Sequence, residues 1–207
     1  MADDCCNAKS KELEQLAQQS DQRRVLVIVL AINFVMFMIE FGGGLLAGSA
    51  SLMADSVDML GDALVYGASI FVLTRGPRWK AGAAALKGGI VLIFGLGVLV
   101  QTGFKIVYGV PPSSGLMLVF AGLALVANLT CLALLWRFRS QDINMSSTFE
   151  CSRNDVAANI GVLVAAMLVG WLNSAWPDIF VAAVIAALFL RSAYGILSQS
   201  IKEFRAV

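Results

Sequence analysis

The chain alternates between long apolar stretches and short polar links. Six stretches are each close to the roughly 20 residues that a helix needs to cross the hydrocarbon core of a bilayer. They cover residues 25–47, 51–74, 83–104, 114–136, 152–173 and 177–197. A segment surrounded by lipid must satisfy its own backbone hydrogen bonds, so each stretch predicts a helix. The pattern therefore predicts an all-α fold, an integral membrane bundle of six transmembrane helices.

Basic residues gather at alternate ends of these helices. The links between helices one and two and between helices three and four are uncharged, although Lys105 lies just before the second of them. The opposite ends hold Arg23, Arg24, Arg75, Arg78, Lys80, Arg137, Arg139, Lys202 and Arg205. Because Lys and Arg near membrane helices stay in the cytoplasm, we expect both termini there.

Composition agrees with a membrane protein that has one domain. The chain is 58% hydrophobic and 14% charged, whereas a soluble domain carries about 25% charged residues. Residues 1–22 form a polar cytoplasmic tail without the features of a cleaved signal peptide, and residues 23–207 form the transmembrane domain. A net charge of +1 without a dense basic cluster argues against nucleic acid as a partner. The absence of histidine removes a common metal ligand and proton carrier.

Acidic residues inside the predicted membrane are concentrated in two helices. In the second helix, Asp55, Asp58 and Asp62 are spaced by three and four residues, so they share one face. In the fifth helix, Cys151 and Asp155 are four residues apart. The fifth helix enters from the cytoplasm, so its first turns and the middle of the second helix meet at a similar depth. Polar residues at such depth usually mark a pathway or a site.

The two four-residue pairs supply four ligating groups that converge on one point. They are Asp58 and Asp62 from the second helix and Cys151 and Asp155 from the fifth. Four is the number of ligands that a tetrahedral divalent ion takes. Three carboxylates cannot all stay ionised side by side in a bundle of low dielectric without a cation or shared protons. The pattern indicates a bound cation or a store of protons, and we favour a metal ion.

Four further polar residues extend this region as accessory candidates. Asp55 begins the acidic face of the second helix and serves as a ligand, a helix cap or a hydrated side chain. Glu40 in the first helix accepts a proton, guides the cation or packs with Asn33. Asn159 continues the stripe of the fifth helix, and with Asn128 of the fourth it is expected to form hydrogen bonds around the ligands or between helices.

The stretches "SLMADSVDMLGDA" and "CSRNDVAANIGVLVAA" give the chain a family resemblance. From about residue 25 to 205 it resembles the cation diffusion facilitator (cation efflux) family of metal transporters. In that family a His or Asp typically precedes an Asp by four positions in both helices. The matching positions here are Asp58 and Asp62, then Cys151 and Asp155. The family also carries an acidic residue late in the first helix and an Asp opening the sixth, similar to Glu40 and Asp178.

The resemblance implies efflux of a divalent cation from the cytoplasm, exchanged for protons by alternating access, in a homodimer. The transported ion is then substrate, no prosthetic group is expected, and the membrane is the bacterial inner one. Cys151 stands where the family usually has His or Asp. Three oxygen ligands and a thiolate suit Zn²⁺ or Cd²⁺ better than Mn²⁺ or Mg²⁺ and leave softer ions open. Because the chain stops at Val207, we expect a short form without the family's cytoplasmic domain, dimerising through membrane helices such as the Gly-rich third.

Other classes of protein stay open on the sequence. A membrane scaffold or sensor would use the same polar residues only to hold helices together. An intramembrane aspartyl protease would pair Asp62 with Asp155, but it has no use for Asp58 and Cys151. A multidrug exporter would add an aromatic cage, and few aromatic residues lie near these acids. We therefore rank a secondary transporter first, a structural protein second and an enzyme third.

Overall fold

The structure is a computed structural model of the whole chain that describes residues 2–72, 77–140 and 143–206. Within those ranges it contains helices and no strand. The helices are α1 (Ala2–Ala47), α2 (Ala50–Val72), α3 (Pro77–Tyr108), α4 (Ser114–Trp136), α5 (Ile143–Leu172) and α6 (Trp176–Ala206). The predicted all-α fold with six helices is confirmed. Arg75, used above for orientation, lies outside the described residues, as do the side chains of Cys5 and Cys6.

The helices run further than the apolar stretches that predicted them. Only α4 keeps the predicted bounds, 114–136. The polar tail continues as one helix with the first span, because α1 reaches back to Ala2. Likewise α5 begins at Ile143, well before residue 152. Hydropathy marks where the chain leaves the membrane, whereas backbone hydrogen bonding continues wherever helix-forming residues follow.

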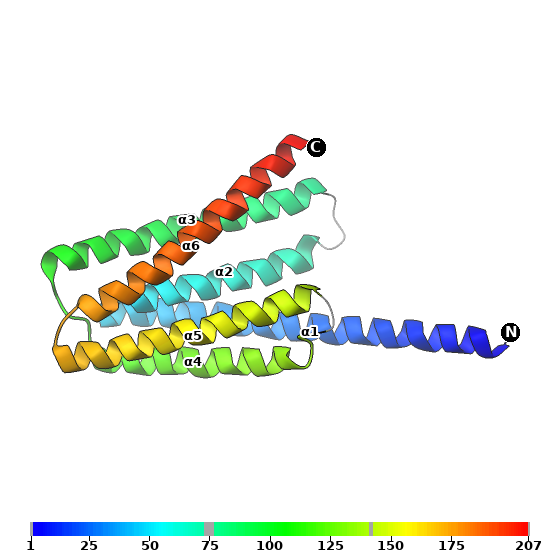
Figure 1. Cartoon of the computed structure of the whole chain (residues 1–207), viewed down its shortest axis with the longest axis horizontal. Coiled ribbons are helices and arrows are strands. Elements are labelled where there is room, and N and C mark those ends of the chain that lie inside the picture. The colour runs from blue at the N-terminus through cyan, green and yellow to red at the C-terminus, as the bar shows by residue number, and fades with distance from the viewer. Residues whose placement is uncertain (1, 73–76, 141–142, 207) are drawn as a thin grey trace.

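The bundle consists of a four-helix group and a pair (Figure 1). The group contains α1, α2, α4 and α5, in which α1 packs on α2 and α4, and α4 packs on α5. Helices α3 and α6 pack mainly on each other, and both also contact α2. We call the end that carries the α1–α2, α3–α4 and α5–α6 connections the outer end. It lies opposite the termini in Figure 1.

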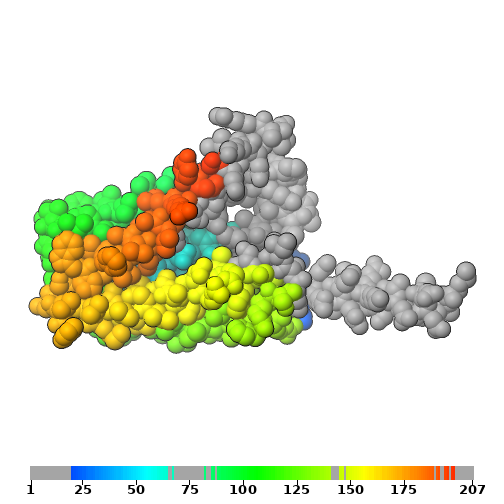
Figure 2. Space-filling view, viewed as in Figure 1, coloured from blue at the N-terminus to red at the C-terminus, as the bar shows by residue number. Residues whose placement is uncertain are grey.

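Helix α2 is the interior element of the fold. Between Ala50 and Ala63, nearly every described side chain is buried, Leu52, Ala54 and Val57 completely. Figure 2 shows α2 from one face only as a strip between α5 and α6. A helix enclosed by its neighbours can carry polar side chains that lipid would not tolerate.

The described helices include segments that could cross a membrane. Among the described residues, four helical segments are long and apolar enough to do so: Ser20–Ala47, Gly88–Tyr108, Ser114–Trp136 and Thr148–Leu172. In α6 an apolar segment is described over Trp176–Leu188. Helix α2 lies alongside the other helices in Figure 1. Its three aspartates exceed the charge that a lipid-facing span tolerates, which agrees with its interior position.

A tightly packed apolar core fills the bundle toward its outer end. Leu52 of α2, Met117 of α4 and Val162 of α5 are fully buried in one cluster with Ala47 and Val169. The α1–α2 connection turns at Gly48, whose φ of 64° a residue with a Cβ rarely adopts. The backbone N–H of Ser113 donates to the carbonyl of Ala47 at 2.9 Å, which ties the α3–α4 connection to α1. The outer end is therefore closed by packing.

The glycines of α3 are open within a single chain. A Cβ added at Gly89, Gly97 or Gly103 would meet nothing within 4 Å in the described part of the chain, whereas at Gly95 it would touch Leu190 of α6. The predicted dimer contact through α3 thus has free space, but it stays a prediction.

Candidate metal centre

The three aspartates of α2 lie at different depths of the closed bundle. Asp55 is buried, at 1% exposure, whereas Asp58 and Asp62 are half-buried. Because α2 runs inward from Ala50, Asp58 and Asp62 lie progressively nearer the cytoplasmic end. The shared face expected from their spacing is turned toward α5. The outermost of the three is therefore enclosed by protein and is not hydrated.

Asp155 is the residue of α5 that meets this face. Its side chain is 8% exposed. It contacts Asp58 and lies close enough to Asp62 for their charges to act on each other. Carboxylates that meet out of water repel one another unless they share a cation or a proton. Asp58, Asp62 and Asp155 thus concentrate acidic charge between α2 and α5.

Cys151 differs from Asp155 in its exposure. It is exposed, although it begins the stripe that Asp155 continues. No group of three or more Cys, Asp or Glu side chains is close enough to hold a metal ion among the residues whose placement is described. The four-ligand set of Asp58, Asp62, Cys151 and Asp155 therefore stays a prediction, of which the structure brings the three aspartates into proximity.

A second polar layer lies one turn further out. The Nδ2 of Asn159 donates to Oδ2 of Asp55 at 2.5 Å, and the Nδ2 of Asn128 donates to Oδ1 of Asn159 at 3.1 Å. This chain links α4, α5 and α2, as expected of interhelical hydrogen bonds in a membrane. Glu40 of α1 is also fully buried, and its nearest charged neighbours are Asp55 and Asp58.

Helix α4 contributes a thiol that the sequence did not single out. Cys131 is 1% exposed, and it lies close enough to Asp155 and Asp62 to be acted on by their charges. Asn33 of α1 donates from Nδ2 to its sulfur at 3.9 Å and to the carbonyl of Val29 at 3.0 Å. Asn33 therefore pairs with α4 and not with Glu40. The signal available in the sequence is that Asn33 and Cys131 are polar or ligating residues within apolar spans.

The outer end contains a buried ion pair that sequence reasoning left unexplained. The Nζ of Lys105 lies 2.6 Å from the Oδ2 of Asp178, with side-chain exposures of 11% and 0%. Asp178 also accepts the backbone N–H groups of Ala50 and Ser51 at 2.9 and 3.0 Å, and the hydroxyls of Ser49 and Ser51, each at 2.6 Å. A carboxylate at this helix start is stabilised by the free N–H groups and the helix dipole. Lys105 was the one basic residue near an outer link, and this pairing accounts for it.

The first turns of α5 carry an ion pair on the surface. Arg153 lies 2.5 Å from Glu150, and both side chains are about half exposed.

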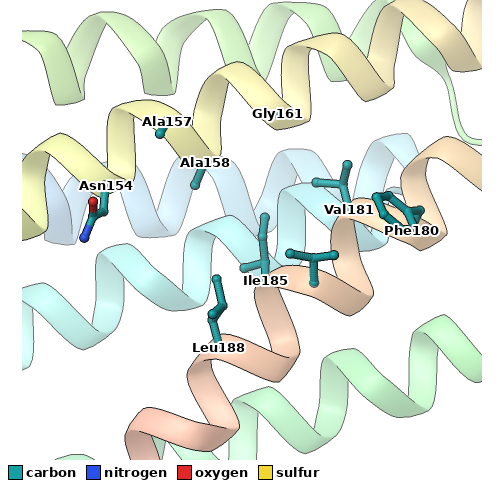
Figure 3. A pocket seen from close by; sticks show the side chains of 9 residues that line it. Asn154, Ala157, Ala158, Gly161, Phe180, Val181, Ile185 and Leu188 are labelled. Atoms are coloured by element: carbon teal, nitrogen blue, oxygen red, sulfur yellow. The ribbon is translucent and has the colours of Figure 1, made fainter.

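An apolar groove of about 420 Å³ runs between α5 and α6 (Figure 3). Its walls include Ala158 and Gly161 of α5 and Ile185 and Leu188 of α6, and Asn154 is its polar residue. Neither Asp155 nor Cys151 lines it. The groove therefore lacks the candidate ligands, since Asp155 lies toward Asp58 of α2 and Cys131 of α4.

The chain belongs to the cation efflux family. The sequence model of the cation efflux transmembrane domain matches residues 26–204, which include all the residues of the candidate centre. The resemblance seen in the motifs of α2 and α5 is thereby confirmed. The protein is a multi-pass integral membrane protein of the bacterial plasma membrane, and it falls in a family of transporters and not of enzymes.

Several bacterial transporters are similar to the chain. The cation efflux system protein CzcD of Alcaligenes sp. (strain CT14) is 26% identical over 193 residues, 86% of this chain and 60% of the relative. A cadmium, cobalt and zinc/H(+)-K(+) antiporter of Bacillus subtilis is 24% identical over 196 residues, 84% of this chain and 61% of the relative. The zinc transporter ZitB of Escherichia coli K12 is 24% identical over 210 residues, 95% and 67%. The chain thus spans about 60–67% of the length of these relatives.

Proposed function

We propose that this protein exports a divalent metal cation, Zn²⁺ or Cd²⁺, from the cytoplasm in exchange for protons. The single observation that carries the proposal is the position of Asp155, buried in the bundle against Asp58 and near Asp62. Three carboxylates held close together repel one another, and a divalent ion or protons relieve this repulsion. The printed names of the relatives, which include zinc, cadmium and cobalt, support a metal ion as the cargo.

Exchange for protons follows from the same carboxylates. Each must be ionised to ligate a metal ion, so binding of the ion displaces protons, and arriving protons promote its release. The Bacillus subtilis relative is named as a cadmium, cobalt and zinc/H(+)-K(+) antiporter, and that name supports this coupling. In an alternating-access cycle, the carboxylates of Asp58, Asp62 and Asp155 carry the metal ion outward and protons inward. Cys151 completes the ligand set when the cytoplasmic ends of α2 and α5 approach each other.

The test is metal uptake into inside-out membrane vesicles with a pH gradient, offered Zn²⁺ or Cd²⁺ separately. Wild-type vesicles should accumulate the ion, and collapsing the gradient should stop uptake. Asp155→Asn should lower the rate at least about tenfold, since it removes a ligand. Glu150→Gln is the matched control, because this acid lies on the same helix but is exposed and paired with Arg153.

Two results would contradict the proposal. Wild-type protein that is folded in the membrane but takes up neither ion would exclude zinc and cadmium export. If Asp155→Asn takes up the ion as fast as the wild type, transport does not depend on the centre that includes Asp155. A loss of stability in Asp155→Asn without any transport by the wild type would instead support a protein whose polar residues only hold helices together.

A further inference from the structure

Glu40 is a fully buried carboxylate whose nearest charged neighbour is another acid, Asp55. Its side chain is 0% exposed, and neither of its carboxylate oxygens accepts a hydrogen bond in the described part of the chain. An ionised carboxylate without a partner costs several kcal/mol to bury. Such a group is retained in a membrane helix where it binds something.

The groups that surround Glu40 are acidic. Asp55, its nearest charged neighbour, is also buried, and Asp58 lies beyond it. Asn159 holds Asp55 in place by donating to one of its oxygens, and Asn128 fixes the orientation of Asn159 in turn. Two carboxylates therefore face each other across the contact between α1 and α2, with one amide as support. Their charges favour a cation between them.

This pair lies further out than the metal centre. Asp55 precedes Asp58 on α2, which starts at the outer end, and Asn159 follows Asp155 on α5, which ends there. Glu40 lies two turns before the outer end of α1 at Ala47. All three helices thus place the pair between the metal centre and the outside.

We propose that Glu40 and Asp55 form a second cation site, which the transported ion occupies on its way out of the centre formed by Asp58, Asp62 and Asp155. The inference rests on the proposed export function. The second site offers oxygen ligands alone and fewer of them, so it holds Zn²⁺ or Cd²⁺ more weakly. A weaker site further along the path suits transport, because an ion must bind well enough to enter and loosely enough to leave.

The packing between the pair and the outer end determines when an ion can leave this site. One turn further out, Leu52 is fully buried in the apolar cluster with Ala47, Met117 and Val169. An ion at Glu40 and Asp55 is therefore shielded from the outside in this conformation. It leaves when the outer ends of the helices separate.

The test is equilibrium binding of Zn²⁺ and Cd²⁺, each alone, to the purified full chain in detergent. Wild-type protein should bind two ions per chain with different affinities. Asp155→Asn should weaken the tighter event at least about tenfold and keep the weaker one. Glu40→Gln, which is isosteric and removes a buried charge, should keep the tighter event and remove the weaker one. Asp55→Asn should behave as Glu40→Gln does, and Glu150→Gln should match the wild type.

The outcomes distinguish failure of the second cation site from failure of the proposed export function. If wild-type protein binds and transports the ion but Asp155→Asn binds none, the second site is excluded while export stands. If Glu40→Gln changes only the pH dependence of transport and leaves both binding events, the pair holds a proton, and the cation site is again excluded. Absence of both binding and transport in the wild type would instead remove the proposed function itself.

Discussion

The two cysteines of the bundle differ in their surroundings. Cys131 of α4 is buried beside Asn33, with Asp155 and Asp62 nearby. Cys151 of α5 is exposed and lies four residues before Asp155. A thiolate favours soft cations, so whichever cysteine reaches the ion adjusts the preference between Cd²⁺ and Zn²⁺.

We predict that Cys151→Ser lowers Cd²⁺ uptake relative to Zn²⁺ uptake, by about tenfold in the ratio of the two rates. Serine offers a weakly binding hydroxyl in place of a soft thiolate, and zinc tolerates oxygen ligands better than cadmium does. The measurement is competition between the two ions in the vesicle assay. Cys131→Ser is the matched control. If Cys131→Ser changes the ratio and Cys151→Ser does not, the thiol ligand comes from α4.

Sequence spacing located the candidate residues but not all of their neighbours. The three- and four-residue intervals correctly placed Asp58 and Asp155 where α2 and α5 meet, because periodicity within one helix fixes which residues share a face. It cannot fix the rotation of one helix against another. For that reason Glu40 was assigned a packing alternative with Asn33, whereas the structure turns it toward Asp55. Cys131 was missed for the same reason.

At the scale of elements, α2 depends on contacts that its own sequence does not reveal. Its start is held by Asp178, which comes from the other end of the chain and accepts the N–H groups of Ala50 and Ser51. Lys105 of α3 balances the charge of Asp178. Helices α2, α3 and α6 are thus joined at the outer end by one buried network. The sequence offered two separate signs of it, Lys105 near an uncharged link and Asp178 at the start of the sixth predicted helix, but not their contact.

We predict that Lys105→Met destabilises the protein by about 3–5 kcal/mol, because it leaves the buried carboxylate of Asp178 without its cation. The measurement is the unfolding of purified protein in detergent with rising temperature. Arg137→Met is the control, since the pair of Arg137 with Asp21 is exposed and contributes about 1 kcal/mol at most.

A second variant distinguishes loss of the charge pair from loss of packing. The double change Lys105→Met with Asp178→Asn removes both charges, so it should recover part of the stability lost in Lys105→Met. If the double variant is no more stable than the single one, the long side chain of Lys105 matters through its packing. If Lys105→Met and Arg137→Met lose the same stability, the ion pair at the outer end is not a structural element.

At the scale of the whole molecule, the acidic residues are protected by the arrangement of the helices. Helix α2 runs through the interior and carries three aspartates, while the helices around it present large apolar side chains such as Phe34, Val100 and Val126 outward. The fold class could be predicted from sequence because lipid imposes it. The packing of α3 on α6 could not, because it depends on shape.

The orientation of the bundle in the membrane gives the last prediction. The connection at Ser113 lies at the outer end, and the connection at Ser140 lies at the end where the termini are; both side chains are exposed. In a background in which Cys5, Cys6, Cys131 and Cys151 are serine, a membrane-impermeant thiol reagent should label Ser113→Cys in right-side-out vesicles and Ser140→Cys in inside-out ones. The basic residues Arg137 and Arg139 beside Ser140 require this, since they stay in the cytoplasm. Labelling with the opposite sidedness would show that the bundle has the inverse orientation in the membrane and that the proposed direction of transport is reversed. Labelling of both positions from one side would mean that α4, the helix between them, does not cross the membrane.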